Sequence, residues 1–504
     1  MFKIKIKAGD KKIIYKNLSV SVKYIVDEKK LGQTVQNLER VFNVHFSELQ
    51  KKTFLSETCF EMSVEKPEGK PDTMIISKIK LDEKFTVDHF RNHLAGLIQK
   101  LENNALKNLH IFIPAYSSFK EFFDSEEYFY QTFVEGIHYG NYKFDQYKSD
   151  KKARTELNVF LYASNPKKLK SAISRGDAIM DAVSFAKNLQ NEPGVKVYPE
   201  SLAQIVSGAL RKEKINVRIF DDKEIARKKM GGLLAVGKGS DHPPRFIVAH
   251  YLPLSGKSGK RKNSLKRVAI VGKGITFDSG GISLKPAAKM GEMKADMSGA
   301  AAVAGTLLAA SKLKLPVEIF GIIPSAENMP SGKSMKPGDI VMTSSGKTVE
   351  IDDTDAEGRV ILSDALHYAS KLKPDEIIDL ATLTGACVVA LGEFAAGLFT
   401  KNDKLADGLY KSGMKTFDRV WRLPLWDDYH SLNKSNVADV KNLGGRWGGA
   451  ITAAKFLENF VDKKIPWAHL DIAGPAFPSE LNNYTKTYMT GFGVRLLIEY
   501  LSER

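Results

Sequence analysis

The chain has 504 residues, more than the ~100–200 residues of a typical single domain, so we expect two domains. Hydrophobic residues make up 43% of it and charged residues 27%, a globular composition that excludes a fibrous or disordered chain. Lysine and arginine number 75 against 59 acidic residues, and the resulting net charge of +16 leaves anionic partners such as nucleic acid open.

The sequence predicts a cytoplasmic protein without a membrane segment. Residues 1–7 alternate apolar and lysine side chains, which is typical of an edge strand and unlike the apolar core of a signal peptide. The most apolar stretch, residues 381–399, is interrupted by glycines and polar residues and falls short of a membrane span. Cys59 and Cys387 are far apart, so neither a disulfide framework nor a cysteine zinc site is expected.

The first part of the chain alternates short predicted strands and helices. The clearest strands are residues 74–79, 109–113 and 157–161, and we expect a small N-terminal α/β domain at residues 1–165. A long amphipathic pattern follows and ends at Asn191-Glu192-Pro193, which predicts a connecting helix over residues 166–192.

The remaining residues, 193–504, repeat a strand, loop and helix pattern. Strands are predicted at 267–271, 317–323, 376–380 and 467–471, and helices at 300–313 and 359–372. This alternation predicts an α/β fold with a mainly parallel central sheet in the larger, C-terminal domain. In such folds ligand sites gather at the carboxyl ends of the strands.

Acidic residues follow several of these predicted strands. Asp278 lies in a glycine-rich segment directly after the strand that ends at Val271, and Asp296 lies in a second loop. Asp355, Glu357 and Arg359 alternate along the chain, so all three would face one side of an extended segment. Four carboxylates at one sheet edge predict divalent metal, and two ions ~3.5–4 Å apart need bridging carboxylates of this kind.

Other sites fit the residues less well. The run Gly332-Lys333-Ser334 is no phosphate-binding loop, because Glu327 stands where the first glycine is required. The pair His89 and His93 has Phe90 in place of the glutamate of a zinc protease, and we interpret it as a solvated helix face. A single loop aspartate is more often a turn or cap residue, but three acidic loops together favour metal. Spacing alone leaves phosphatase and peptidase activity both open.

Three segments, residues 271–286, 293–300 and 353–360, closely resemble the leucyl aminopeptidase family of cytosolic aminopeptidases, peptidase family M17. The resemblance covers most of residues 186–504 and is weak over the first 165 residues, and it implies that residues 193–504 form a catalytic dimetal aminopeptidase domain. Asp353 stands where the family usually has asparagine, and Val360 where it usually has leucine. Neither position is a metal ligand in that family.

The resemblance implies two divalent metal ions, Mn²⁺ or Zn²⁺, in each subunit. It assigns Asp278 and Glu357 as bridging ligands that are shared by both ions. The tighter ion would also take Lys273 and Asp296, and the more exchangeable ion would also take Asp355. Lysine is an unusual ligand, because only its neutral amine has a lone pair and its ordinary pKa is ~10.4.

The resemblance also implies a mechanism and a substrate class. A metal-bridging water would attack the scissile carbonyl, Lys285 would stabilise the resulting gem-diolate, and a bicarbonate ion held by Arg359 would serve as the general base. Met293 and Thr382 would line the pocket for the first side chain, which favours leucine and other apolar residues. The substrates would be short peptides, and the expected assembly is a homohexamer.

Nucleic-acid binding is the alternative function. Residues 257–267 hold six basic residues among eleven and no acidic one, which would suit DNA. The run contains no aromatic side chain to stack on bases, and we favour a solvated surface loop.

Overall fold

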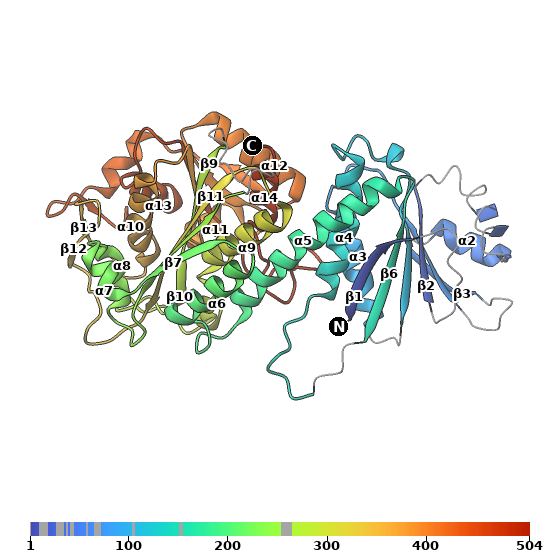
Figure 1. Ribbon diagram of the computed structural model, residues 1–504, viewed down its shortest axis with the longest axis horizontal. Helices are drawn as coiled ribbons and strands as arrows, with labels where there is room; N and C mark the ends of the chain where they lie inside the picture. The colour runs from blue at the N-terminus through green and yellow to red at the C-terminus, as the bar shows by residue number, and fades with distance from the viewer. Residues whose placement is uncertain are drawn as a thin grey trace. The chain divides into compact units, whose positions relative to one another are not determined.

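The computed structural model describes residues 2–9, 19–26, 35–36, 39–40, 45–56, 59–64, 72–102, 106–150, 155–253 and 265–504. The chain divides into two compact units, Met1–Met180 and Asp181–Arg504, each with its own sheet (Figure 1). Helix α5 (Pro166–Asn191) runs through this boundary in the chain. Domain limits at residues 165 and 192 stay a prediction. Among the described residues, no helix is both long and apolar enough to cross a membrane.

The first unit is built on a six-stranded sheet with the strand order β1-β6-β5-β2-β4-β3. The predicted strands appear as β4, β5 and β6, and the alternating N-terminal segment forms β1 at the sheet edge, paired in parallel with β6. These predictions are confirmed. The elements of this unit are β1 (Lys3–Ala8), β2 (Ser19–Ile25), α2 (Glu48–Ser56), β3 (Cys59–Val64), β4 (Asp72–Lys78), α3 (His89–Leu101), β5 (Asn108–Phe112), η2 (Tyr116–Ser118), α4 (Glu126–Asn141) and β6 (Glu156–Tyr162).

The interpretation of His89 and His93 as a solvated helix face is wrong. Both side chains are partly buried on α3, where His89 stacks on Phe85 at a ring-centroid distance of 5.0 Å and His93 packs edge-on against Tyr24 at 5.6 Å. Burial lowers the pKa of His93 to about 4, so this imidazole is neutral at physiological pH. The pair therefore belongs to an aromatic cluster. Comparison of the sequence with the zinc-protease motif could not reveal this packing.

The second unit contains a nine-stranded sheet with the order β16-β15-β18-β14-β9-β11-β8-β7, and β10 also pairs with β11. The central strands β18, β14, β9 and β11 run parallel, while β8 and β15 pair antiparallel with their inner neighbours. The predicted α/β class with a mainly parallel centre is confirmed. Helices α8 and α10 pack on one face of the sheet and α6 and α9 on the other (Figure 1).

The sheet strands and main helices of this unit are α6 (Pro199–Lys212), β7 (Asn216–Phe220), α7 (Asp222–Arg227), α8 (Gly231–Gly237), β8 (Arg245–Tyr251), β9 (Arg267–Gly272), β10 (Gly274–Asp278), α9 (Ser298–Leu313), β11 (Glu318–Asn328), α10 (Glu357–Lys371), β14 (Glu376–Ala381), β15 (Ala396–Phe399), α12 (Asp403–Thr416), β16 (Val420–Arg422), α13 (Gly449–Glu458), β18 (Trp467–Asp471) and α14 (Val494–Ser502). A small separate sheet joins β12 (Ile340–Met342), β13 (Thr348–Glu350) and β17 (Val440–Lys441). The short elements that remain are η3 (Met290–Ala295), α11 (Gly385–Leu391) and η4 (Asp427–Asn433).

Helix α9 approaches the central strands at a pair of glycines. A methyl group on Gly299 would lie 2.1 Å from the Leu380 carbonyl oxygen, and one on Gly272 would lie 2.4 Å from the Gly299 carbonyl oxygen. The close approach lets the backbone of Lys273 bond on both sides, because its amide donates to Leu380 at 3.0 Å and its carbonyl accepts from Ala300 at 2.9 Å. The backbone of Lys273 is thereby fixed between α9 and β14.

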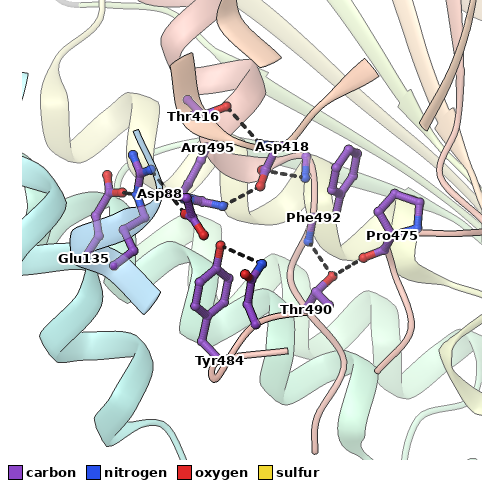
Figure 2. Close-up of polar contacts among 12 residues, drawn as sticks. Asp88, Glu135, Thr416, Asp418, Pro475, Tyr484, Thr490, Phe492 and Arg495 are labelled. Atoms are coloured by element: carbon purple, nitrogen blue, oxygen red, sulfur yellow. Dashed lines mark hydrogen bonds and ion pairs between the residues drawn. The ribbon is translucent and has the colours of Figure 1, made fainter. Parts of the chain in front are cut away.

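The segment between β18 and α14 is anchored by polar contacts near its end. Asp418 accepts hydrogen bonds from Arg495 at 2.6 Å and from the Gly493 amide at 3.1 Å, and the Thr490 hydroxyl donates to the Pro475 carbonyl at 2.7 Å (Figure 2). The Asp418 and Arg495 side chains are both buried, so their charges compensate each other. These bonds fix the course of residues 475–493, which begin beside the wall of the cavity described below.

Candidate active site

The predicted site residues lie where neighbouring strands of the nine-stranded sheet end. Lys273 connects the carboxyl end of β9 to β10, and Asp278 is the last residue of β10. Asp296 directly follows η3, and Thr382 directly follows β14. The carboxyl ends of parallel strands are where α/β folds bind their ligands, so the side chains gather at the edge that the fold favours.

The segment that carries Asp355, Glu357 and Arg359 is not extended, so that expectation is wrong. Asp355 lies in a turn, and α10 begins at Glu357. The turn is held by the Asp353 carboxylate, which accepts a hydrogen bond from the Asp355 amide at 2.8 Å. The helical start sends the Glu357 and Arg359 side chains in different directions, and the acidic residues still converge because the turn precedes the helix directly.

Lys273 bridges two of the predicted ligands. Its Nζ lies 2.7 Å from Asp296 Oδ2 and 2.9 Å from Glu357 Oε1. It also donates to the carbonyl oxygen of Thr382 at 2.9 Å, and all of these side chains are buried. Thr382 closes the group by donating its hydroxyl to Asp296 Oδ1 at 2.8 Å. Three residues from three separate segments, Asp296, Glu357 and Thr382, thus surround the Lys273 amine.

Lys285 bridges the other two carboxylates. Its Nζ lies 2.8 Å from Asp278 Oδ2 and also forms an ion pair with Asp355 Oδ1. Asp278 is buried, whereas Asp355 and Lys285 remain partly exposed to solvent. This half of the site is therefore the one that opens to the surface.

The site carries more negative than positive charge at its centre. Burial and the neighbouring Asp278 carboxylate raise the pKa of Glu357, and they raise the pKa of Asp355 in the same way. Burial also raises the pKa of Asp296. For Lys273 burial alone would lower the pKa, but the charges of Asp296 and Glu357 outweigh it and raise the pKa. Four carboxylates against two ammonium groups favour further cations.

The donor set fits divalent metal. Oxygen atoms of Asp278, Asp355 and Glu357 lie within 4.8 Å of one another, close enough to hold an ion in common. Within the described part of the chain, the buried oxygens Asp296 Oδ2 and Glu357 Oε1 have no polar partner other than the Lys273 ammonium. Carboxylate oxygens with one amine suit Mn²⁺ or Zn²⁺ better than a soft metal. The three clustered carboxylates are those that the resemblance implies for the more exchangeable ion.

Asn328 is a site residue that the sequence did not reveal. It ends β11 opposite Asp278, and its Nδ2 donates to Asp278 Oδ1 at 2.8 Å and to the Thr354 carbonyl at 3.1 Å. The Gly280 amide donates to the same Asp278 oxygen at 2.9 Å. These bonds leave Oδ2 of Asp278 directed toward Lys285 and fix the orientation of a predicted bridging ligand.

Replacing Asn328 by alanine is expected to weaken binding of the more exchangeable metal by about 10–100-fold, the usual effect of losing a hydrogen bond to a metal ligand. The Asp278 carboxylate would lose one of its two orienting donors. The measurement is the metal concentration that half-restores activity to the stripped protein. Asn459→Ala, which removes an amide that bonds only helix carbonyls of α13 in the described chain, is the control and should leave that concentration unchanged.

Arg359 offers donors for an anion. The side chain is buried, and its Nη1 donates to the Asn442 carbonyl at 2.8 Å. Within the described residues its Nε has no hydrogen-bond partner. Burial lowers the pKa of Arg359 to about 10, which still leaves the guanidinium charged at neutral pH. A buried cation with an unused donor fits a small bound anion such as bicarbonate.

A cavity of about 630 Å³ opens beside these groups. Its walls include Met293 on η3 and the apolar residues Leu383 and Phe477. Glu357 is buried and contacts the cavity residue Lys273. Eight of the nine predicted site residues line the cavity: Lys273, Asp278, Lys285, Met293, Asp296, Asp355, Arg359 and Thr382.

Residues 184–498 match the catalytic domain of the cytosol aminopeptidase family, which is peptidase family M17. The chain belongs to this family. It is an aminopeptidase, and the resemblance seen in the sequence motifs is confirmed. The matched region contains every residue of the cavity and all of the predicted metal ligands.

Relatives of the cytosol aminopeptidase family match most of the chain. A probable cytosol aminopeptidase of Chloroherpeton thalassium is 47% identical over 440 residues, which cover 84% of this chain and 85% of the relative. One of Aquifex aeolicus is 44% identical over 432 residues, with 85% and 84% covered. Among solved structures, the bottromycin maturation enzyme BotP in complex with Mn has a TM-score of 0.82 at 31% identity, covering 96% of this chain and 99% of that one.

Proposed function

We propose that the protein is a dimetal aminopeptidase that removes N-terminal residues, preferably leucine and other apolar ones, from short peptides in the cytoplasm. The observation that carries this proposal is the convergence of four carboxylates and Lys273 beside a cavity with apolar walls. Membership of the cytosol aminopeptidase family and the Mn complex of the similar BotP structure support it.

The chain's own residues would hold two metal ions. Lys273, Asp278, Asp296 and Glu357 would hold the tighter ion, and Asp278, Asp355 and Glu357 the more exchangeable one. When bound, the ions supply Lewis acidity for the attacking water and the scissile carbonyl. Lys273 has to lose its proton to act as a ligand, and the two dications provide the field that favours the neutral amine.

Two cations would serve the reaction directly. Lys285 reaches carboxylates on two different loops, which places its ammonium at the open side of the site, where it can stabilise the oxyanion that develops on the substrate carbonyl. Arg359 would bind bicarbonate, which supplies the general base when it is bound. No histidine lines this cavity among the described residues, which agrees with a base that is not a side chain.

The apolar wall would select the first residue of the substrate. Met293 lies on η3, three residues before Asp296, and Thr382 bonds that same aspartate. A side chain that contacts Met293 would therefore lie next to the predicted tighter metal. Methionine is flexible and fills irregular apolar space, which suits leucine and similar side chains.

The chain should hydrolyse leucine p-nitroanilide, lose this activity in a chelator, and recover it when Mn²⁺ or Zn²⁺ is added. The reason is that the proposed reaction depends on metal ions, and the carboxylate cluster of Asp278, Asp355 and Glu357 is the group that could hold one among the described residues. Metal analysis of the purified protein gives the stoichiometry and identifies the ion. Full activity in the chelator, or in Lys285→Ala, would rule out the proposed roles.

We also propose a homohexamer, on the basis of family membership. Large apolar side chains of the catalytic unit are exposed in the single chain and support burial against other copies; they include Val389, Phe394 and Trp426.

The DNA-binding alternative gains no support. Of the basic loop 257–267, residues 257–264 lie outside the described residues. Of its last two basic residues, Lys266 forms an ion pair with Glu376, and Arg267 lies 3.7 Å from Glu318. These two charges are compensated within the fold, and the interpretation of the rest of the run as a solvated loop stays a prediction.

A further inference from the structure

The loop after β17 brings a cation to the rim of the active-site cavity. Arg446 and Trp447 stand between Gly445 and Gly448, whose φ values of 87° and 64° lie in the left-handed region that glycine adopts readily. A bend at Arg446 and a turn at Trp447 and Gly448 expose these two side chains between β17 and α13. Both side chains are exposed, and Arg446 lines the cavity.

The Arg446 guanidinium is held against an aromatic ring. Its central carbon lies 5.0 Å from the centroid of the Trp447 ring, within the range of a cation–π contact. This contact restricts the long arginine side chain and leaves the planar fork of N–H donors available. A stacked, preoriented guanidinium is suited to binding a carboxylate in bidentate geometry.

The Arg446 guanidinium has no charged partner within the described part of the chain and is available to bind an anionic ligand. Among the described residues it forms no ion pair and no side-chain hydrogen bond, although Glu292 and Glu393 line the same cavity. Neither glutamate carboxylate forms an ion pair with the Arg446 guanidinium. The loop is tied to the catalytic residues at its start, because Asn442, four residues earlier, accepts the hydrogen bond of Arg359.

We propose that Arg446 binds the C-terminal carboxylate of short peptides and so selects dipeptides and tripeptides over longer or C-terminally blocked ones. This inference rests on the proposed function, which places the substrate's amino end at the carboxylate cluster. A dipeptide extends ~7 Å from there, and its carboxylate would then face the cavity wall that Arg446 lines together with the carboxylate cluster. Arg446 is a specificity residue of the rim and takes no part in bond cleavage.

The test compares leucyl-glycine with leucyl-glycinamide, which differ in the terminal charge alone. In Arg446→Gln we expect KM for leucyl-glycine to rise about tenfold with kcat little changed, and the kinetics of the amide and of leucine p-nitroanilide to stay within about twofold. The preference of the unmodified enzyme for leucyl-glycine should weaken with added salt, because the rim is exposed. Arg218→Ala, an exposed arginine on β7 that pairs with Glu224, is the matched control.

An equal change for both peptides, or none, would overturn the inference while the anilide activity keeps the proposed function intact. Arg446→Lys retains the charge but loses the fork, and should recover only part of the preference for the free carboxylate. If the unmodified protein hydrolyses no leucine substrate, the proposed function fails. Calorimetric binding of leucyl-glycine and leucyl-glycinamide to the protein and to Arg446→Gln then still decides whether Arg446 binds the carboxylate.

Discussion

Glu357→Gln is expected to lower kcat/KM for leucine p-nitroanilide by about a thousandfold or more, equivalent to ~4 kcal/mol of lost transition-state stabilisation. Glu357 contacts Lys273 and lies in the cluster with Asp278 and Asp355, and in the proposed function it would be shared by both metal ions. Glutamine has nearly the same shape but no charge, so a bridging position loses its negative ligand while the packing around α10 is retained.

The same variant should bind fewer metal ions, which mass spectrometry of the protein digest can measure. Glu393→Gln is the matched control, because it removes one carboxylate from the wall of the same cavity and leaves the cluster intact. We expect less than a threefold change there, which is ~0.7 kcal/mol. Two bound metal ions and ordinary activity in Glu357→Gln would contradict the ligand assignment.

Gly299→Ala is expected to destabilise the catalytic unit by about 3 kcal/mol or more, at the upper end of the cost of overpacking. The new methyl group would lie 2.1 Å from the Leu380 carbonyl oxygen and 2.7 Å from the Lys273 amide nitrogen. Both are backbone atoms in adjoining parts of the sheet, so they cannot turn aside as a flexible side chain would. The helix α9 would have to move away and loosen the backbone bonds of Lys273.

Thermal unfolding and residual activity together test this expectation. A lower unfolding midpoint should be accompanied by weaker metal binding, because Lys273 is held by the bonds that the methyl group disturbs. Gly208→Ala is the opposite control: nothing lies within 4 Å of its new methyl group, and it stands inside the exposed face of α6. There alanine should stabilise by about 0.5–1 kcal/mol, through its helix propensity. An unchanged midpoint for Gly299→Ala would show that α9 can shift without cost.

Much of the catalytic unit follows from the sequence because its strands and helices alternate regularly. The apolar strands β9, β14 and β18 appear within about one residue of their predicted limits. Each is a short, fully or mostly buried run, and the polar residues inside two of them, Asp379 in β14 and His469 in β18, are buried and bond each other. The acidic residues lie at the end of β10, directly after η3, or at and just before the start of α10, near the carboxyl ends of the parallel strands, so their convergence follows from the topology of the sheet.

The features that the sequence did not predict depend on contacts between distant segments. Strand β11 continues past Pro324 to Asn328, although proline ordinarily ends a strand, and only the pairing with β10 shows that Asn328 reaches Asp278. The partial burial of His89 and His93 depends on aromatic side chains from other elements. The turn at Asp355 is set by a local hydrogen bond from its own amide, which the alternating acidic pattern conceals.

The backbone bonds of Lys273 tie the metal site to the cooperative unfolding of the whole catalytic unit. Its amide and carbonyl are both engaged between β14 and α9, at the centre of the sheet, so the lysine cannot leave its place through a local fluctuation of a surface loop. A metal ion that binds only this folded arrangement stabilises it in proportion to the logarithm of its free concentration. If the proposed ions bind there, metal supply and resistance to unfolding are linked in this enzyme, and a cell short of the ion would lose folded protein as well as activity.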